Sequence, residues 1–112
     1  MDITRRRGDT YADSFTITLR SSGDFANLSG CSFLLTLDTR KDPTDNSTNV
    51  YQLVGVISDP ASGVVTFAPN DTQANKIGYF YYDVQMIDQS GKKRTITPYG
   101  AQYVYVEDIT KT

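Results

Sequence analysis

A two-residue alternation of apolar and polar side chains runs through most of this chain, and it limits the folds that the chain can adopt. In "SFTITLR", residues 14–20, every second side chain is apolar, and "CSFLLTLD", residues 31–38, repeats the pattern. Successive side chains of a β-strand point to opposite faces, so this period is typical of strands with one buried face. The side chains predicted to face the core are Phe15, Ile17, Leu19, Cys31, Phe33, Leu35, Leu37, Phe80, Tyr82, Val84, Met86, Val104 and Val106.

About seven such strands follow one another, with Gly, Pro, Asp and Ser gathered in the turns between them. We expect residues 50–58 and 64–68 to pair as a hairpin across the turn "DPASG". Residues 69–78 are predicted to hold one short turn of helix, capped by Asp71 or Thr72 and ended by Gly78. Strands do not alternate with helices, so a parallel α/β sheet is not expected. An immunoglobulin-like antiparallel sandwich, or a barrel, is predicted over residues 1–112 as one domain.

Composition narrows the functions that this chain can have. Of its 112 residues, 38% are hydrophobic, and the formal net charge of −2 gives no electrostatic reason to expect nucleic acid or a membrane as partner. The chain has no histidine, which removes the commonest general base and zinc ligand, and no carboxylate pair is marked out for catalysis. We therefore expect no enzyme and no cofactor.

The remaining compositional signals concern cysteine, targeting and calcium. The single cysteine, Cys31, cannot form an internal disulfide and is expected to pack as a small hydrophobe. No stretch resembles a signal peptide or is long enough to span a bilayer, so synthesis in a cytoplasm is expected. The polar loop 39–49 contains Asp42, Asp45 and Asn46, for which a solvated turn is the default and a calcium site the alternative.

The amino-terminal "RRRGDTY" contains both a run of arginines and Arg-Gly-Asp. Adhesion through this tripeptide needs an exposed loop tip, whereas Gly8 more simply allows the backbone to bend before the next strand. Arg5 and Arg7 cannot lie on the same face as Arg6, because neighbours in a strand alternate sides. We expect a solvated edge, or arginines that grip an acidic protein partner.

Tyrosines are predicted to gather on the outward face of two strands. Tyr79 and Tyr81 share one face of their strand, and Tyr103 and Tyr105 share one face of theirs. If the two strands lie in one sheet, the four rings form a single patch. Such a patch is explained equally by cross-strand aromatic pairing and by a protein interface, and both interpretations stay open.

The order of these features resembles the small immunoglobulin-like domains of tailed bacteriophages, similar to the amino-terminal domain of baseplate upper proteins. The opening "RGDT" precedes the first long strand, and "NLSG", residues 27–30, leads into the next. The pattern G-x-Y-x-Y-D-[VLI]-Q resembles residues 78–85, and D-x-x-G-x-x-x-T resembles residues 88–95. The pattern V-x-[ED]-[DN]-[VI]-T resembles residues 106–110, which are shorter by one position. The resemblance covers nearly the whole chain.

This resemblance implies an immunoglobulin-like β-sandwich in a virion structural protein, most often at the tail tip or baseplate, that acts as an adaptor or connector. Baseplate upper proteins continue into longer carboxy-terminal parts, which favours a compact connector here over a receptor-binding protein. The expected partners are other virion proteins, in a homo-oligomer or symmetric array. A capsid decoration protein and a carbohydrate-binding module that uses exposed tyrosines are the alternatives. The residues expected to contact partners are Arg5, Arg7, Tyr79, Tyr81, Tyr103 and Tyr105.

Overall fold

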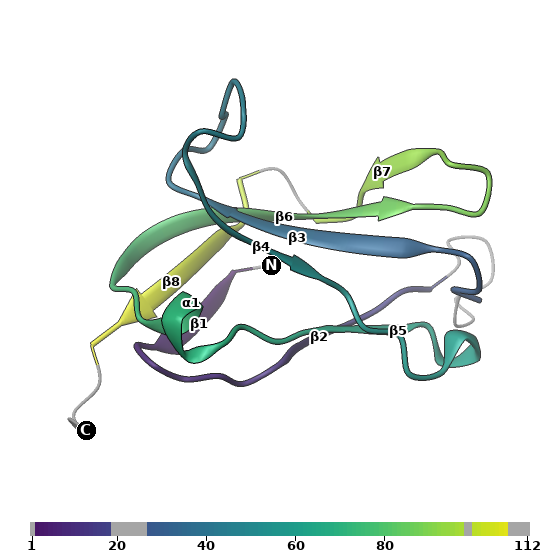
Figure 1. Ribbon diagram of the computed structural model, residues 1–112, viewed down its shortest axis with the longest axis horizontal. Coiled ribbons are helices and arrows are strands. Elements are labelled where there is room, and N and C mark those ends of the chain that lie inside the picture. Colours follow the sequence, from purple (N-terminus) through teal and green to yellow (C-terminus); the bar gives the residue numbers. More distant parts are fainter. Residues whose placement is uncertain (1, 19–26, 98–99, 108–112) are drawn as a thin grey trace.

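Two β-sheets face each other across one hydrophobic core in the computed structural model, which describes residues 2–18, 27–97 and 100–107 (Figure 1). The larger sheet has the order β1-β8-β6-β3-β4, with β7 beside the second half of β6, and the smaller sheet pairs β2 with β5. The strands of the larger sheet are β1 (Ile3–Arg6), β3 (Ser32–Asp38), β4 (Asn49–Val54), β6 (Gly78–Ile87), β7 (Lys93–Thr95) and β8 (Gln102–Val106); those of the smaller are β2 (Asp13–Thr16) and β5 (Val64–Phe67).

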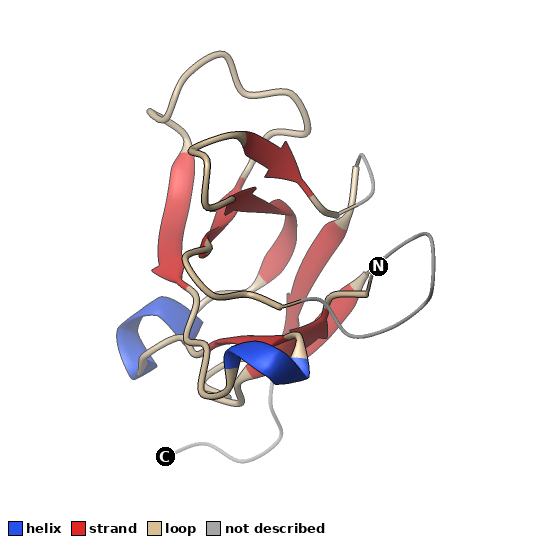
Figure 2. Cartoon of the chain, turned by 90° about the vertical axis from the view of Figure 1, so that its right-hand side faces the viewer, coloured by secondary structure: helices blue, strands red, loops and turns tan. Residues whose placement is uncertain are grey.

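The predicted all-β sandwich is confirmed, with two refinements. The described residues form eight strands, because β1 precedes the first long strand, and β1 lies parallel to β8 whereas every other pair is antiparallel. Figure 2 shows the two short helices, α1 (Asp71–Ala74) and η1 (Pro60–Ser62), beside the smaller sheet. The strands therefore supply most of the core, and α1 adds the buried Ala74.

The core contains the side chains that the two-residue alternation predicts for β2, β3 and β6. Phe15 of β2, Phe33, Leu35 and Leu37 of β3, and Val84 of β6 are buried, and the side chains between them on each strand are more exposed. Tyr82 is also buried, whereas Ile17, Cys31, Phe80 and Met86 are partly buried and pack against this core. Leu19 lies outside the described residues.

The predicted orientation of β8 is wrong. Tyr103 and Tyr105 are each 1% exposed, while Val104 is half-buried and Val106 is exposed. Ala101 is buried in phase with the two tyrosines, so the inward set on this strand is 101, 103 and 105. A buried tyrosine is favourable when its ring packs and its hydroxyl finds a partner. The Tyr103 hydroxyl finds Asp13 of the smaller sheet, and the Tyr105 hydroxyl finds Tyr51 of the same sheet. Valine can occupy either face of a strand, so the alternation alone did not determine which alternate residues of β8 face the core.

The predicted hairpin between residues 50–58 and 64–68 is also replaced by a different arrangement. β4 stays in the larger sheet beside β3, whereas β5 pairs with β2 in the smaller one. One residue pair joins the two segments: Val56 and Thr66 exchange backbone hydrogen bonds of 2.8 and 3.0 Å. The chain thus crosses from one sheet to the other at Gly55.

Replacing Gly55 with alanine is expected to lower the free energy of unfolding by about 1–3 kcal/mol, because the core has no room for a methyl group there. A Cβ atom would lie 2.5 Å from Val65 Cγ2 and 2.9 Å from Phe33 Cβ. Urea unfolding of G55A, V65A and the double variant tests this. The two effects should be less than additive, because removing the Val65 methyls relieves the clash. Additive effects would contradict the crowding described here.

The local signals at turns are confirmed in part. Gly8 has φ +85°, and the turn closes with Asp9 N donating to Arg6 O at 3.1 Å, so the Arg-Gly-Asp sequence forms the predicted bend. The predicted helical turn exists as α1, but its cap is Asn70, which exchanges hydrogen bonds with Gln73 in a capping box. Gly78 does not end the helix and instead begins β6.

Candidate functional site

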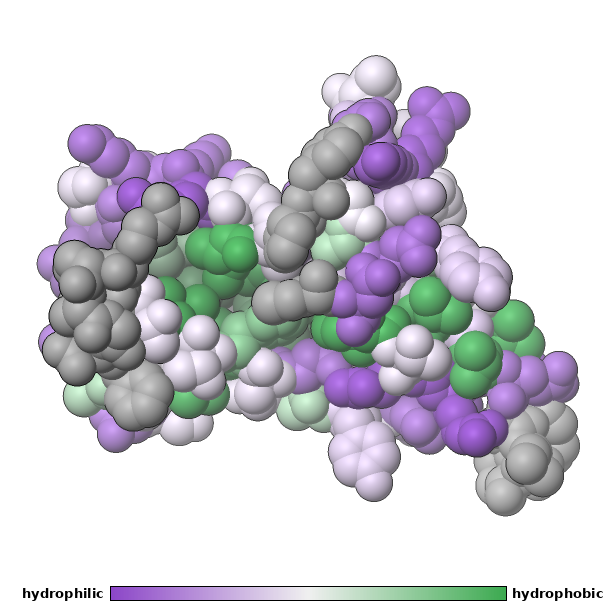
Figure 3. Space-filling view, turned by 180° about the vertical axis from the view of Figure 1, so that it is seen from behind, coloured by the Kyte–Doolittle hydropathy of each residue, from purple (hydrophilic) through white to green (hydrophobic). Residues whose placement is uncertain are grey.

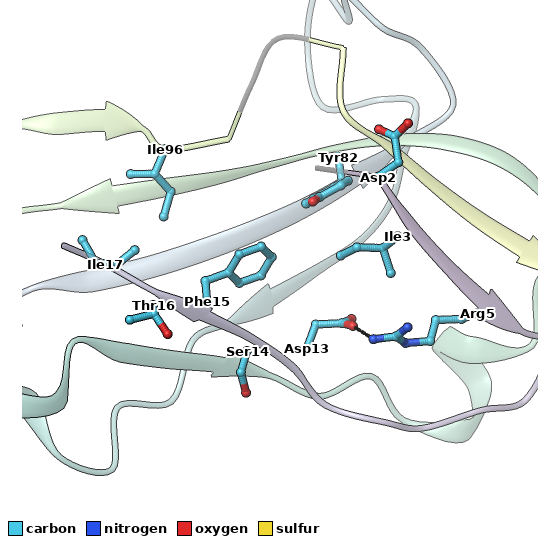
Figure 4. A pocket seen from close by; sticks show the side chains of 10 residues that line it. All are labelled: Asp2, Ile3, Arg5, Asp13, Ser14, Phe15, Thr16, Ile17, Tyr82 and Ile96. Atoms are coloured by element: carbon cyan, nitrogen blue, oxygen red, sulfur yellow. Dashed lines mark hydrogen bonds and ion pairs between the residues drawn. The ribbon is translucent and has the colours of Figure 1, made fainter. Parts of the chain in front are cut away.

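A buried polar cluster joins the two sheets beneath the first two strands. It consists of Arg5 on β1, Asp13 on β2 and Tyr103 on β8, and we call it the Asp13 cluster. Asp13 is 4% exposed and forms an ion pair with Arg5 Nη2, drawn as a dashed line in Figure 4. Its second carboxylate oxygen accepts a hydrogen bond of 2.5 Å from the Tyr103 hydroxyl. The carboxylate is therefore bonded through both oxygens.

Two tyrosine hydroxyls that share a hydrogen bond lie beside the Asp13 cluster. The Tyr51 and Tyr105 hydroxyl oxygens share a hydrogen bond of 2.9 Å, and the Tyr103 and Tyr105 ring centroids are 5.2 Å apart. Burial raises the pKa of Tyr103, and the hydrogen bond to Asp13 with its negative charge raises that pKa further. Burial likewise raises the pKa of Tyr51 and of Tyr105. These phenols keep their protons at neutral pH. The Tyr103–Asp13 hydrogen bond links the two sheets, whereas the Tyr51–Tyr105 pair joins β4 and β8 of the larger sheet.

Beside the Asp13 cluster, β1 and β2 diverge and leave a cleft of about 430 Å³, which we call the β1–β2 cleft. Figure 4 shows Ile3, Phe15 and Tyr82 reaching into the space between the two strands, with the Arg5–Asp13 pair at one end. Figure 3 shows the back of the molecule, where hydrophobic residues form a band across the middle between hydrophilic margins. Its lining mixes apolar side chains, among them Ile3 and Phe15, with polar ones, among them Asp2, Ser14 and Thr16.

The outward face of the larger sheet carries an apolar patch at one end. Tyr79 of β6 lies beside Val104 of β8, and Gly78 lies beside Tyr105, which brings Ile77 next to Val106. Tyr79 is 76% exposed, Ile77 52% and Val106 37%. We call these four side chains the outer patch: Ile77, Tyr79, Val104 and Val106.

A polar cleft of about 560 Å³ lies between loop 39–48 and the β6–β7 hairpin. Figure 1 shows the loop and β7 on the same side of the larger sheet. Arg40 of the loop and Thr95 of β7 both line the cleft. The polar lining includes Thr36, Asp38, Arg40, Tyr81, Asp83 and Thr95. A smaller pocket of about 330 Å³ adjoins it and shares Thr36, Pro43 and Asp83.

Asp38 holds both ends of the loop that forms one wall of this cleft. Its carboxylate accepts hydrogen bonds from Arg40 N at 2.8 Å, Thr48 Oγ1 at 2.8 Å and Asn49 Nδ2 at 2.5 Å. Burial by itself raises the pKa of Asp38, but these hydrogen bonds outweigh burial and lower it. A carboxylate bonded in this way stays ionised and fixes the start and the end of the loop.

The structure divides the six predicted contact residues among several places. Tyr79 and Tyr81 lie on the outward face of β6 as predicted, but Tyr79 is in the outer patch and Tyr81 lines the polar cleft. Tyr103 and Tyr105 are in the core, so the predicted patch of four tyrosines is wrong. The Arg5 guanidinium is directed inward to Asp13, and Arg7, half-buried, follows β1 with its backbone N donating to Val106 O at 2.7 Å.

The calcium alternative gains no support from the part of the chain that the structure describes. There, no group of three or more His, Cys, Asp or Glu residues is placed to hold a metal ion. The Asp45 carboxylate accepts hydrogen bonds from Ser47 N and Ser47 Oγ, at 2.9 and 2.5 Å, which is the solvated turn expected for this loop. Within the same described ranges, no helix has the length and hydropathy needed to cross a bilayer.

Comparison with known proteins assigns this chain to no family. No protein-family model matches this chain, and no curated protein matches its sequence.

Proposed function

We propose that this chain is a virion structural protein of a tailed bacteriophage, a connector at the tail or baseplate that docks against other virion proteins. The sequence resemblance to immunoglobulin-like baseplate domains supports the position in the particle, and the β-sandwich is compatible with it. The proposed role is binding without catalysis, in a homo-oligomer or a symmetric array.

The outer patch is the observation that favours docking. Its exposed side chains, Ile77, Tyr79 and Val106, lie together on one sheet face, where a partner can remove all of them from water at once. Tyrosine is enriched at protein interfaces because a large ring contributes much contact area with few rotatable bonds. Arg6, opposite Val106 on β1, adds a cation at the edge of the patch for an acidic partner.

Replacing Tyr79 and Val106 together with serine is expected to reduce incorporation into particles by about tenfold or more, because the central apolar contacts are lost. The measurement is the amount of chain per particle, by quantitative mass spectrometry of particles assembled with each variant. Val54→Ser is the matched control, since Val54 is an equally exposed residue on the same sheet face but at the β4 edge. All variants should unfold at similar denaturant concentrations. Equal incorporation of the double variant would remove the outer patch as the docking surface.

Immunogold electron microscopy of source particles tests the position. Gold at the tail end is expected. Gold over the head would replace the connector with a capsid decoration protein. Absence of gold, together with absence of the chain's peptides from purified particles, would overturn the virion assignment.

A further inference from the structure

We propose that the polar cleft between loop 39–48 and the β6–β7 hairpin binds a neutral oligosaccharide. This role goes beyond docking through the outer patch, involves different residues, and does not depend on the proposed function.

The cleft has the size and form of a small-ligand site. Its volume of about 560 Å³ is within the usual range for such sites, roughly 300–1,000 Å³. The adjoining pocket of about 330 Å³ continues it past Thr36 and Asp83, which line both spaces. The two together form an elongated trough across β3 and β6, which suits a short chain of sugar rings better than a single compact ligand.

The lining offers the mixture of groups that a sugar needs. A pyranose has hydroxyl groups around its edge, which both donate and accept hydrogen bonds, and C–H groups on its faces, which pack on aromatic rings. Tyr81 supplies a half-buried ring at the cleft. Within the part of the chain that the structure describes, this ring packs against no other aromatic ring. Thr36 and Thr95 supply hydroxyls, and the Arg40 guanidinium supplies N–H donors.

Asp83 indicates that the ligand donates hydrogen bonds and is not an anion. Among the described residues, no hydrogen bond or ion pair reaches its carboxylate, although it lines both parts of the trough. Burial raises the pKa of Asp83, and the nearby negative charge of Asp38 raises it further. Asp83 is exposed, and its carboxylate can accept hydrogen bonds from ligand hydroxyls. The lining holds three carboxylates, Asp38, Asp42 and Asp83, against two cations, Arg40 and Lys41, which disfavours phosphate, sulfate or acidic sugars.

The walls of the cleft are fixed before a ligand arrives. Asp38 bonds to both ends of loop 39–48, and Pro43 restricts the backbone within it. The Lys41 side chain of the same loop passes close to Gly100, where a Cβ atom would lie 2.9 Å from Lys41 Cε. A fixed wall lowers the entropy that binding must overcome.

The test compares two tyrosines of the same strand face in a titration with defined sugars. The neutral probes are maltotriose and chitotriose, and sialyllactose is the anionic probe. We expect isothermal titration calorimetry to detect at least one neutral probe, with sialyllactose at least about tenfold weaker. Tyr81→Ala and Asp83→Ala should each weaken binding by about tenfold or more, while Tyr79→Ala, two residues away in the outer patch, leaves it unchanged.

Tyr81→Phe separates loss of the site from loss of the fold, because it keeps the ring and should keep most of the affinity. Absence of binding by both neutral probes would overturn the proposal, as would a stronger response to sialyllactose. Equal loss in Tyr79→Ala and Tyr81→Ala would also overturn it, since binding would then not belong to the cleft. Failure of particle incorporation in the outer-patch variants has no bearing on these outcomes.

Discussion

Replacing Asp13 with alanine is expected to lower the free energy of unfolding by about 3–5 kcal/mol. The change leaves the Arg5 guanidinium without its ion-pair partner and the Tyr103 hydroxyl without its acceptor, both at the contact between the two sheets. Removing one member of a hydrogen-bonded charge pair costs more than the pair contributes, because the remaining group stays partly desolvated. The Arg5 side chain is 31% exposed, which favours the lower end of this range.

Urea unfolding at neutral pH measures this effect. Asp13→Asn should cost less, because an amide keeps one acceptor for the tyrosine hydroxyl. Asp71→Ala is the control, since Asp71 is an exposed aspartate at the start of α1. Arg5→Ala and the double variant complete a cycle in which the two changes should be strongly non-additive. An Asp13→Ala effect below about 1 kcal/mol would mean that the Asp13 cluster does not stabilise the sandwich.

Alkaline pH is expected to unfold this protein steeply. Burial raises the pKa of Tyr82 to about 12, and burial also raises the pKa values of Tyr51, Tyr103 and Tyr105 above the ordinary value of about 10. Above about pH 10 the unfolded chain releases these phenolic protons while the folded chain keeps them. The folded state then binds more protons, so stability falls as pH rises. Each such tyrosine contributes up to about 1.4 kcal/mol per pH unit.

The measurement is the free energy of unfolding at several pH values from about pH 8 to about pH 11.5, with tyrosinate absorbance recorded in parallel. These phenols should leave the free energy of unfolding nearly constant up to about pH 9.5. Above that pH the free energy of unfolding should decrease, together with a cooperative rise in tyrosinate absorbance. Tyr51→Phe should make the decrease shallower by the contribution of one phenol. A stability that does not change above about pH 10 would contradict the burial of these rings.

Much of the fold can be predicted from local patterns. In β3, Phe33, Leu35 and Leu37 alternate with Ser32, Leu34 and Thr36, and only one face is consistently large and apolar, so the inward face is unambiguous. The bend at Gly8 was also predictable from a local signal, because glycine accepts a positive φ without strain.

The candidate sites could be predicted only in part. The exposure of Tyr79 and the outward placement of Tyr81 follow from the alternation in β6. The Asp13 cluster was missed, although one signal was present: Asp13 is in phase with Phe15 and Ile17, so an aspartate stands at an inward position. A charged residue in that phase indicates a buried partner, but the sequence does not say which residue it is.

What the sequence alone determined is the class of structure: short strands with turns between them, and for β2, β3 and β6 the face that is buried. Only the tertiary structure decided the phase of β8, the crossing at Gly55 and the parallel pairing of β1 with β8. These features depend on contacts between distant residues; Asp13 and Tyr103 are 90 positions apart. Local periodicity reports which side chains share a face of one strand. Whether a Val or a Tyr face is buried depends on what the other strands place opposite it, and here Asp13 and Tyr51 supply the partners that make burial of the tyrosines favourable.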